Sequence, residues 1–370
     1  MGSTSDPAGS QPGRLLKSQA VADALLRRIS AGEWAIGDRL PTERELAVSH
    51  GVGINTVRRA VGMLERAGLV RRAQGSGTYL IDIPGPNGPG PGKPLMGVVL
   101  PAAKYYTPGI VEGIGEGARQ AGWQVLISYS TFEPALELER CHELLTLGVR
   151  GLVLSPSFHQ CDDPEQHLVR LQGLGVPIVL VDRRPPTLTA EQTSYVATDR
   201  ESAAHIAVRR FVELGRRRVG YFGTHGANSG DVRDAFGRAL TAFDLPTVPG
   251  ALVERRPWTR QDVTDYVTTC RESKVDAVLC MDDRKALLLL PALLAAGLGV
   301  PDDVSVIAYD DAVHDLAAVP LTTVSPPKFE VGRRAAEFLV HQITHGAAAA
   351  ICHAEMQPRL VVRDSCTPER

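Results

Sequence analysis

The sequence LPTERELA at residues 40–47 decides the fold of the first part of the chain, together with INTVRRAVGMLERAGLV at 54–70 and RRAQGSGTYL at 71–80. Thr42, followed three residues later by Glu45, forms the capping-box pattern and predicts the start of a helix. The second stretch has the apolar periodicity of another helix, and the third places two short strands around a glycine-rich turn. We therefore expect a winged helix-turn-helix.

This module, expected over residues 14–83 with a first helix at about 15–30, predicts a double-stranded DNA partner. A helix of this size fits the major groove, where its first residues meet the base edges. Arginines and helix N-termini bind phosphate, and a glycine-tipped wing can approach the DNA backbone closely. Because packing uses the opposite helix face, four residues are expected to point outward: Asn55, Thr56, Arg58 and Arg59. A merely solvated helix face is the alternative.

The charge distribution supports this reading. The chain of 370 residues has a net charge of −2, but residues 14–83 hold eleven Lys and Arg against seven Asp and Glu, which gives +4. Residues 84–370 hold 29 against 34, which gives −5, and Asp6 supplies the remaining negative charge. A basic module on an acidic body indicates that only the module approaches polyanions.

The segments AGEWAIGDRLPTERELA, TVRRA and GSGTYL make residues 14–81 resemble the GntR family of bacterial transcription regulators. The family usually has Ser-Arg where this chain has Gly53 and Ile54, so a base-reading arginine is missing. Asn55 can substitute, because Asn pairs with adenine through two hydrogen bonds. The resemblance implies DNA contacts from Arg44, Thr56, Arg58, Gly75, Ser76 and Gly77, and we add Thr42, Asn55 and Arg59.

Two segments rich in Gly and Pro have no apolar periodicity. Residues 1–13 are expected to be a disordered tail, and residues 84–94 (PGPNGPGPGKP) an extended linker. The linker is followed by a body at 95–370, in which apolar strand runs alternate with helical stretches. Such repeated β-α units predict an α/β body with doubly wound parallel sheets in two subdomains.

The expected elements of the body are short. Strands are expected at 96–100, 124–128, 151–154, 177–181, 196–198, 218–222, 277–280 and 304–308. Helices are expected at 110–121, 135–147, 200–214, 231–243 and 285–296.

Ligands of such sheets bind beyond the carboxyl ends of the strands. Carboxylates, Arg, Asn and Lys with a few aromatic residues suit a polyhydroxylated ligand there, although each acid could instead cap a helix. The acids favour a neutral sugar, while Lys104, Arg183 and Arg233 leave sugar acids and phosphates open. The polar residues at the expected strand ends are Lys104, Tyr105, Tyr106, Tyr129, Asp182, Arg183, Asp199, His225, Asn228, Asp282, Asp283, Asp310 and Asp311.

The body resembles the effector domain of the lactose-repressor family, built on the periplasmic sugar-binding fold. Segments that carry the resemblance include MGVVLP, IVEGIGEGARQAGWQVLI, GVPIVLVDRR, GVPDDVSVIAYDDA and RLVVRDS. The resemblance implies crossings between subdomains near 197 and 325. It also implies an effector site that contains Arg233, Asp282 and Asp310. More weakly, it implies Lys104, Tyr105, Tyr106 and Arg183 in the same site. We add Tyr129 and Asn228 because they lie at expected strand ends.

This sequence departs from that family at several positions. Arg233 stands in RDAFG, where the family has RxxGF, so we take the last two residues as reversed. Asp282 replaces a usual Asn, and 325–327 (SPP) replaces a segment where Gln is common. The family's minor-groove hinge helix is replaced by the Pro/Gly linker. The combination of head and body resembles the arabinose-repressor type.

We therefore expect a DNA-binding transcription regulator that acts as a repressor. A small molecule, which we expect to be a sugar, would control its affinity for the operator. A homodimer on a palindromic operator is expected, because one head makes too few contacts for specificity. No signal peptide or membrane segment is found, so the expected place is the cytoplasm, at the nucleoid through DNA. The effector, the operator and the sign of the response stay open.

Other classes of function are less supported. A solute-binding receptor or cytoplasmic sensor would share the body but not the basic head, and a ligand-independent dimeric regulator would not use the cleft. An enzyme is less supported because the chain has no G-x-S-x-G motif and no P-loop motif. Only His225, near Asp231, offers a local His–Asp pair of the kind found in catalytic sites. His341, His345 and Cys352 could hold zinc, but solvated histidines are expected. We expect no cofactor, and six scattered cysteines indicate reduced thiols.

Overall fold

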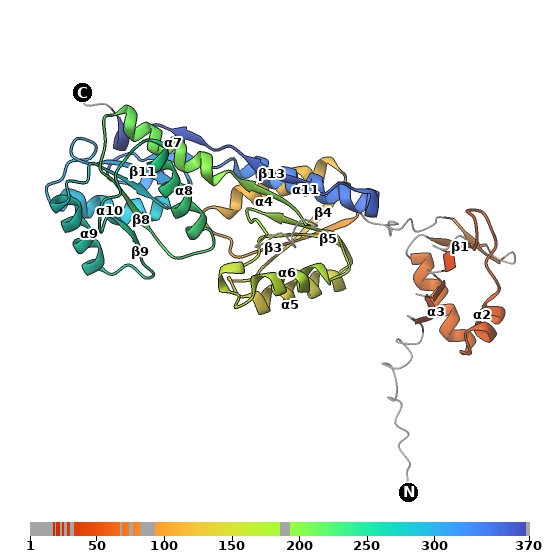
Figure 1. The fold of residues 1–370 in the computed structure, drawn as a ribbon. Coiled ribbons are helices and arrows are strands. Elements are labelled where there is room, and N and C mark those ends of the chain that lie inside the picture. The colour runs from red at the N-terminus through yellow and green to blue at the C-terminus, as the bar shows by residue number, and fades with distance from the viewer. Residues whose placement is uncertain are drawn as a thin grey trace, which may run out of the picture. The chain divides into compact units, whose positions relative to one another are not determined.

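The computed structural model describes residues 18, 20–22, 24–25, 28–29, 33–66, 69–73, 77–81, 93–185 and 193–367. The chain divides into two compact units, Met1–Pro94 and Leu95–Arg370, which we call the head and the body (Figure 1). Among the described residues, no helix is long and apolar enough to cross a membrane.

The head is built from helices around one small apolar core. Helix α2 (Glu43–Ser49) begins with the predicted capping box, in which the Thr42 side chain accepts from the Glu45 amide and Glu45 binds back to Thr42. Helix α3 (Ile54–Arg66) follows after a short turn. The described residues between 18 and 29 are also helical. Buried apolar side chains from all three segments join them: Leu25, Ile29, Leu46, Val57, Val61 and Leu64.

A hairpin completes the head. Strand β1 (Val70–Ala73) pairs antiparallel with β2 (Gly77–Leu80). Residues 74–76, which include the predicted wing residues Gly75 and Ser76, lie outside the described part of the chain. Two helices joined by a turn and followed by a hairpin confirm the predicted winged helix-turn-helix.

The body contains two six-stranded sheets. The first is built from β3 (Leu95–Leu100), β4 (Gln124–Tyr129), β5 (Val149–Leu154), β6 (Ile178–Val181), β7 (Ser194–Thr198) and β13 (His353–Met356). The second is built from β8 (Val219–Gly223), β9 (Leu252–Glu254), β10 (Ala277–Cys280), β11 (Ser305–Tyr309), β12 (Thr322–Ser325) and β14 (Arg359–Val361).

The two sheets repeat one strand order. The first runs β4-β3-β5-β6-β7-β13, and the second runs β9-β8-β10-β11-β12-β14. All neighbours are parallel except β12 and β14, which are antiparallel. Because parallel sheets are covered on both faces, the inner strands are largely buried; every residue of β6, β8, β10 and β11 is buried.

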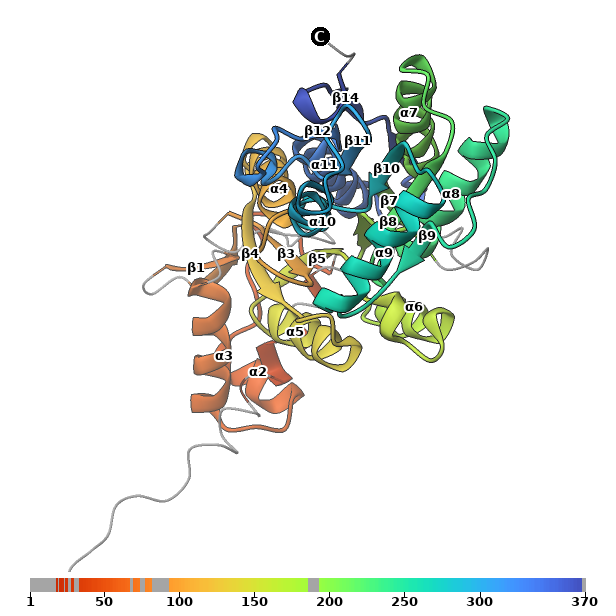
Figure 2. The ribbon, with the colours of Figure 1, turned by 90° about the vertical axis from the view of Figure 1, so that its left-hand side faces the viewer.

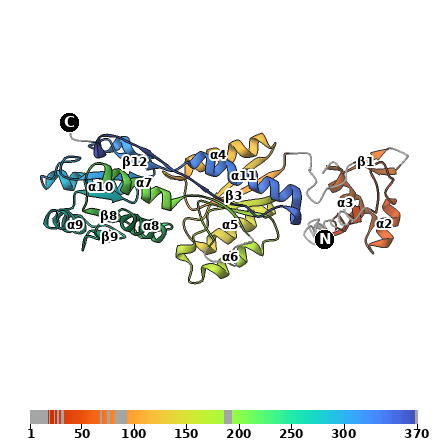
Figure 3. The same ribbon diagram turned by 45° about the horizontal axis from the view of Figure 1, so that its top comes forward.

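Helices cover both faces of each sheet, as the doubly wound prediction requires. Helices α4 (Thr107–Gln120) and α11 (Lys328–His345) share one core with the first sheet, and α5 (Pro134–Thr146) and α6 (Pro164–Gln172) share another (Figure 3). In the second sheet, α7 (Arg200–Glu213) and α8 (Ser229–Ala242) cover one face, and α9 (Arg260–Glu272) and α10 (Asp283–Ala295) cover the other (Figure 2). We call the two sheets with their helices the first half and the second half.

Glycines let α4 and α11 touch backbone to backbone. A Cβ atom on Gly113 would overlap the Phe329 carbonyl, and one on Gly332 would overlap the Ile110 carbonyl. Both glycines are therefore required by the close approach of the helices. The contact fixes α11, which comes late in the chain, onto a helix at the start of the body.

The chain passes between the halves three times, after β7, after β12 and after β13. The crossings expected from the sequence lie near 197 and 325, and none is expected near 357. The third crossing was missed because β13 and β14 are strands of four and three residues with mixed exposure, which show no clear period.

For the same reason β9, another short edge strand, was not expected. Helices α6, α9 and α11 and strand β12 were also not assigned from the sequence. The remaining one-turn helices are η1 (Phe158–Gln160), η3 (His314–Leu316), η4 (Gly346–Ala348) and η5 (Asp364–Cys366).

Candidate ligand cleft and nucleic-acid interface

The exposed side chains of the head gather at the start of α3. Asn55, Arg58 and Arg59 are exposed, and Thr56 is half-buried. Their position at the first turn of the helix follows from the burial of Val57 on the opposite face. Arg44 on α2 is also exposed. Thr42, by contrast, is occupied by the capping box, because its hydroxyl and its amide both bind Glu45.

Two arginines of this surface share one acidic partner. Glu43 accepts from Arg58 Nε at 3.0 Å and from Arg72 Nη2 at 3.4 Å. Arg58 also donates to the Asn55 side chain at 3.2 Å. Exposed ion pairs of this kind contribute only about 0–1 kcal/mol, so a phosphate can replace Glu43 at low cost. Arg72 also donates to the Arg58 carbonyl at 3.0 Å, so it lies with Arg58 on this surface.

The wing is described only at its edge. Gly77 has a φ of 125°, in the region that favours glycine. A side chain here would also overlap the guanidinium of Arg39, whose backbone pairs with Tyr79. Gly77 is therefore required by the structure of the hairpin, and its predicted contact with DNA stays a prediction.

A cavity of about 580 Å³ in the body is lined by loops at the carboxyl ends of strands from both sheets. This is where doubly wound sheets bind ligands. The first half contributes the loops after β3, β5 and β6, and the second half contributes those after β8, β9, β10 and β11. The predicted effector residues that line it are Lys104, Tyr105, Tyr106, Arg183, Asn228, Asp282 and Asp310.

Two predicted effector residues lie elsewhere. Tyr129, at the end of β4, packs against the apolar core of the first half. Arg233 turns away from the cavity and pairs with Glu254 at 3.2 Å and with Asp234 at 3.4 Å. Neither side chain lines the cavity, so we leave both out of the proposed site.

The register of α8 explains the misplacement of Arg233. In the RxxGF motif the arginine precedes the phenylalanine by four residues, which is about one helical turn. Phe236 is fully buried, and the residue four positions before it is Val232, which lines the cavity. Counted back from Phe236, the position that the motif gives to arginine falls on Val232. Arg233 is the next residue along α8, is exposed and does not line the cavity.

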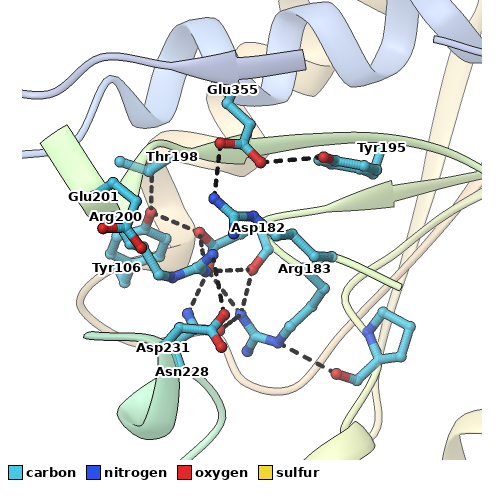
Figure 4. Close-up of polar contacts among 12 residues, drawn as sticks. Tyr106, Asp182, Arg183, Tyr195, Thr198, Arg200, Glu201, Asn228, Asp231 and Glu355 are labelled. Atoms are coloured by element: carbon cyan, nitrogen blue, oxygen red, sulfur yellow. Dashed lines mark hydrogen bonds and ion pairs between the residues drawn. The ribbon is translucent and has the colours of Figure 1, made fainter. Parts of the chain in front are cut away.

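Asp182, directly after β6, is the centre of a buried polar network (Figure 4). Its carboxylate accepts from Arg183 Nη1 at 2.7 Å and lies 3.5 Å from Arg200 Nη2. The Tyr106 hydroxyl donates to it at 2.9 Å, and the Asn228 amide donates at 3.3 Å. Since Arg200 and Asn228 belong to the second half, the network joins the two halves across the cleft.

Burial makes the charges of this network depend on one another. Burial lowers the pKa of Arg183, and the nearby Asp182 opposes that shift. Burial, reinforced by Asp182, raises the pKa of Tyr106 well above its ordinary value, so the phenol remains a neutral donor. Arg200 was not predicted. It follows Asp199, the N-cap of α7, and nothing in the local pattern separates it from an ordinary first-turn residue.

The acids of the second half are less fully paired. Asp282 caps α10 by accepting from the Lys285 amide at 2.8 Å, and its carboxylate lies 3.3 Å from Arg284 and 3.8 Å from Lys285. Asp310 has a φ of 103°, and its side chain has no hydrogen bond or ion pair among the described residues. Burial, followed by the charge of Asp282, raises the pKa of Asp310 well above its ordinary value. A strained backbone that presents an unpartnered acid is typical of functional sites.

Several cavity residues were not selected from the sequence. His159 comes from η1, and Arg256 and Trp258 come from the loop after β9. The Trp258 ring stacks on buried Phe222 at 3.9 Å, and its indole nitrogen donates to the Gly223 carbonyl at 2.6 Å. His159 lies five positions beyond the end of β5, and the strand that precedes Arg256 and Trp258, β9, shows no clear pattern in the sequence.

The zinc alternative gains no support from the described residues. The His345 ring nitrogen bonds to the His341 carbonyl at 2.9 Å, within one exposed helix face. The Cys352 thiol bonds to the Ala350 carbonyl. Within the described part of the chain, no group of three His, Cys, Asp or Glu side chains is placed to hold a metal ion.

Comparisons with known proteins agree with both parts of this description. The family model of bacterial regulatory proteins of the gntR family matches residues 17–80. The model of a periplasmic binding protein-like domain matches residues 208–366.

Relatives that are named as transcription regulators match large parts of this chain. The arabinose metabolism transcriptional repressor of Geobacillus stearothermophilus is 29% identical over 359 residues, which cover 95% of this chain and 98% of the relative. The HTH-type transcriptional regulator CelR of Thermobifida fusca is 32% identical over 268 residues, which cover 71% of this chain and 76% of the relative.

Solved structures are similar in fold. A complex of the transcriptional regulator CelR with cellobiose has a TM-score of 0.63 at 26% identity and matches 88% of this chain and 100% of that structure. A LacI family transcriptional regulator from Silicibacter pomeroyi has a TM-score of 0.61 at 22% identity and matches 74% of this chain and 100% of that structure.

Proposed function

The chain belongs to the transcription regulators that join a gntR-family head to a periplasmic binding protein-like body, and from that premise we propose that a sugar bound in the body controls how tightly the head binds operator DNA. The observation that carries this proposal is the cavity of about 580 Å³, lined by polar loops from both halves. Relatives named as an arabinose repressor and a cellobiose complex support a sugar as the ligand and repression as the response.

The proposed mechanism follows from the position of the cavity between the halves. A ligand that binds Tyr106 and Arg183 of the first half and Asp282 and Asp310 of the second half favours the closed arrangement of the two. The Asp182 network already links the halves, so ligand contacts add to an existing connection. A ligand changes an equilibrium only through different affinities for the two states, and coupling is typically about 1–3 kcal/mol.

The proposed DNA interface is the exposed surface at the start of α3. In this proposal Asn55 and Arg58 meet base edges, and Arg44 and Arg59 meet phosphates; the exposure of all four side chains supports it. A homodimer would place two heads on a palindromic operator, since twofold symmetry in the protein matches twofold symmetry in the DNA. A protein that acts on operator DNA in this way would work in the cytoplasm, at the nucleoid.

The first experiment tests the DNA surface. The full chain selects a palindromic duplex from a randomised pool, and fluorescence anisotropy measures its affinity for that duplex. We expect Arg58→Ala to weaken binding by about tenfold or more, because one good base contact is worth about 1–3 kcal/mol. Arg209→Ala on α7 is the matched control, since both arginine side chains are 55% exposed and both pair with a Glu. Equal losses in the two variants would refute the assignment.

The second experiment tests control by a sugar. Thermal unfolding is measured for the full chain against pentoses, hexoses, disaccharides, sugar acids and sugar phosphates. A ligand at 100 times its Kd stabilises the body by about 2.7 kcal/mol. The stabilising sugar should then change the affinity for the selected duplex by about 5–150-fold. A sugar that binds the body and leaves DNA affinity unchanged would show that the cleft does not control the head.

A further inference from the structure

The side chains that line the cavity carry more positive than negative charge. Six of them are cationic and three are carboxylates, although the body as a whole is acidic. The local excess therefore opposes the average charge of its own domain. The cations are Lys104, Arg183, Arg200, Arg256, Arg284 and Lys285, and the carboxylates are Asp182, Asp282 and Asp310.

Pairing within the cavity leaves this excess in place. Asp182 lies between two arginines, at 2.7 Å from Arg183 and 3.5 Å from Arg200. Asp282 similarly lies within 4 Å of Arg284 and Lys285. Arg200 also lies 3.9 Å from Asp231, whose carboxylate balances the first group, so only the group around Asp282 keeps one net positive charge.

Two further cations have no carboxylate partner among the described residues. Lys104 follows β3 in the first half, and Arg256 follows β9 in the second. The Arg256 side chain donates only to the His225 carbonyl, at 3.5 Å. The remaining acid, Asp310, does not balance them, because it is protonated more readily than an ordinary aspartate.

We propose that the ligand of this cleft is an anionic polyol, a polyhydroxylated molecule that carries one carboxylate or phosphate group. The inference rests on the proposed function and narrows the class of sugar. Neutral sugars would leave the positive excess unbalanced in a partly enclosed cavity, where charges are screened less than in water. An anion held by Arg or Lys forms charge-assisted hydrogen bonds, which are about twice as strong as neutral ones.

The anionic group fits best beside Arg256, Arg183 and His159. Burial, with the charges of Arg183 and Arg256, lowers the pKa of His159 to about 4. The ring is therefore neutral at physiological pH, and both of its nitrogens lack partners among the described residues. A neutral imidazole beside two guanidinium groups can donate its N–H to an anion without adding charge.

The hydroxyl groups of the ligand fit the opposite side of the cavity. Asp282 and Asp310 offer carboxyl oxygens that accept from hydroxyls, and Tyr105 and Trp258 offer aromatic faces. The acids that favoured a neutral sugar in the sequence therefore serve the polyol part. The structure adds four cations that were not expected from the sequence, Arg200, Arg256, Arg284 and Lys285.

The test compares matched pairs by isothermal titration calorimetry of the full chain. Glucuronate and gluconate are compared with glucose, galacturonate with galactose, and glucose 6-phosphate with glucose. We expect one acid or phosphate to bind at least tenfold more tightly than its neutral parent. Its Kd should rise with added salt, because ionic strength screens the attraction. The carboxylate and phosphate arms identify which anion is held.

Variants locate the binding of the anion. Arg256→Gln and Lys104→Gln remove cations without leaving a carboxylate unpaired, so the fold is expected to be kept. Arg256→Gln should weaken the anionic ligand about tenfold, the value of one charged hydrogen bond, and Lys104→Gln should weaken it by a smaller factor. Arg260→Gln, an exposed arginine outside the cavity, should change nothing.

The outcomes separate this inference from the proposed function. A neutral sugar that binds as tightly as its acid overturns the anionic assignment and leaves a sugar-controlled regulator. An anion that binds equally well to wild type and Arg256→Gln overturns the location. Absence of binding across every pair contradicts both the anionic polyol and the sugar-controlled cleft.

Discussion

Asp182 follows β6 in the first half of the body, and Asp310 follows β11, the strand that holds the same place in the strand order of the second half. Both residues have positive φ angles, 55° and 103°, and both line the cleft. Asp182 is bound by two arginines, a tyrosine and an asparagine. Asp310 has no such partner among the described residues, so topologically equivalent acids have opposite surroundings.

The difference shows that the fold fixes where an acid stands and the neighbouring side chains fix what it does. Arg183 follows Asp182, whereas another acid, Asp311, follows Asp310. Asp311 is itself paired with Arg363 at 2.9 Å and so leaves Asp310 alone. We infer that Asp182 holds the two halves together and that the carboxyl group of Asp310 is available to bind the ligand.

Replacement of each acid by glycine gives the largest expected contrast. Glycine adopts a positive φ at no steric cost, so the backbone effect is matched. Asp182→Gly leaves buried Arg183 without a carboxylate and leaves Arg200 with only Asp231, at 3.9 Å, so it should lower the free energy of unfolding by about 3–5 kcal/mol. Asp310→Gly should change it by less than about 1 kcal/mol, because no contact is lost and backbone strain is relieved. Urea unfolding of the full chain measures both, and equal losses would erase the distinction.

The effect on ligand affinity should have the opposite order, with a larger loss for Asp310→Gly than for Asp182→Gly. Asp310→Gly removes a free carboxyl group from the cavity and should weaken the stabilising sugar about tenfold, which is about 1.4 kcal/mol. Calorimetric titration of the folded variant measures this loss. Unchanged affinity would mean that Asp310 does not contact the ligand.

The pH dependence of stability sharpens the comparison further. The pKa of Asp310 is raised in the folded state by burial and by Asp282. Its contribution is therefore complete below the ordinary Asp pKa of about 3.9 and is lost as the pH rises through its own raised pKa, at up to about 1.36 kcal/mol per pH unit. Asp310→Asn should remove this part of the slope in urea unfolding between pH 4 and pH 8. An identical slope in the variant would contradict the raised pKa.

Asp311 provides a control of opposite sign. Burial opposes its ionisation, but hydrogen bonds from Thr323 and Arg363 outweigh burial and lower the pKa of Asp311. Its contribution is present above the ordinary Asp pKa and is lost as the pH falls through its lowered value. Asp311→Asn should therefore change stability most at neutral pH and least in acid.

The smallest expected effect tests one donor of the Asp182 network. Tyr106→Phe removes the hydroxyl that lies 2.9 Å from Asp182 and 3.3 Å from Thr198. The expected loss of unfolding free energy is about 0.5–1.5 kcal/mol, the net value of one hydrogen bond. A loss as large as that of Asp182→Gly would show that the hydroxyl, rather than the arginines, holds the network.

The sequence predicted the head and the general plan of the body well, because both depend on local patterns. The capping box at Thr42 and the periodicity of α3 are complete within a few residues. The apolar runs of β6 and β11 likewise predict strands that are buried on both faces of the sheet. Strand ends then placed Asp182, Asp282 and Asp310 near one another, since parallel strands end at one edge.

What the sequence could not show depends on contacts between distant segments. Arg200 becomes important only because α7 brings it to Asp182, and Arg256 only because the loop after β9 returns to the cleft. The choice between Arg233 and Val232 depends on a helical register that one buried residue, Phe236, decides. These features are set by tertiary packing, which a local pattern does not encode.

The three crossings between the halves have a consequence for how the protein is made. The first sheet needs β13, and its helix layer needs α11, yet both are synthesised after the whole second sheet except β14. A ribosome therefore synthesises residues 95–352 of the body before the first sheet has all of its strands. Until β13 is synthesised, one edge of β7 is unpaired. Until α11 is synthesised, α4 lacks its glycine-lined contact with that helix. Early termination anywhere before residue 353 leaves both halves incomplete, so truncated chains of this protein should be cleared by proteases rather than persist as a folded first half.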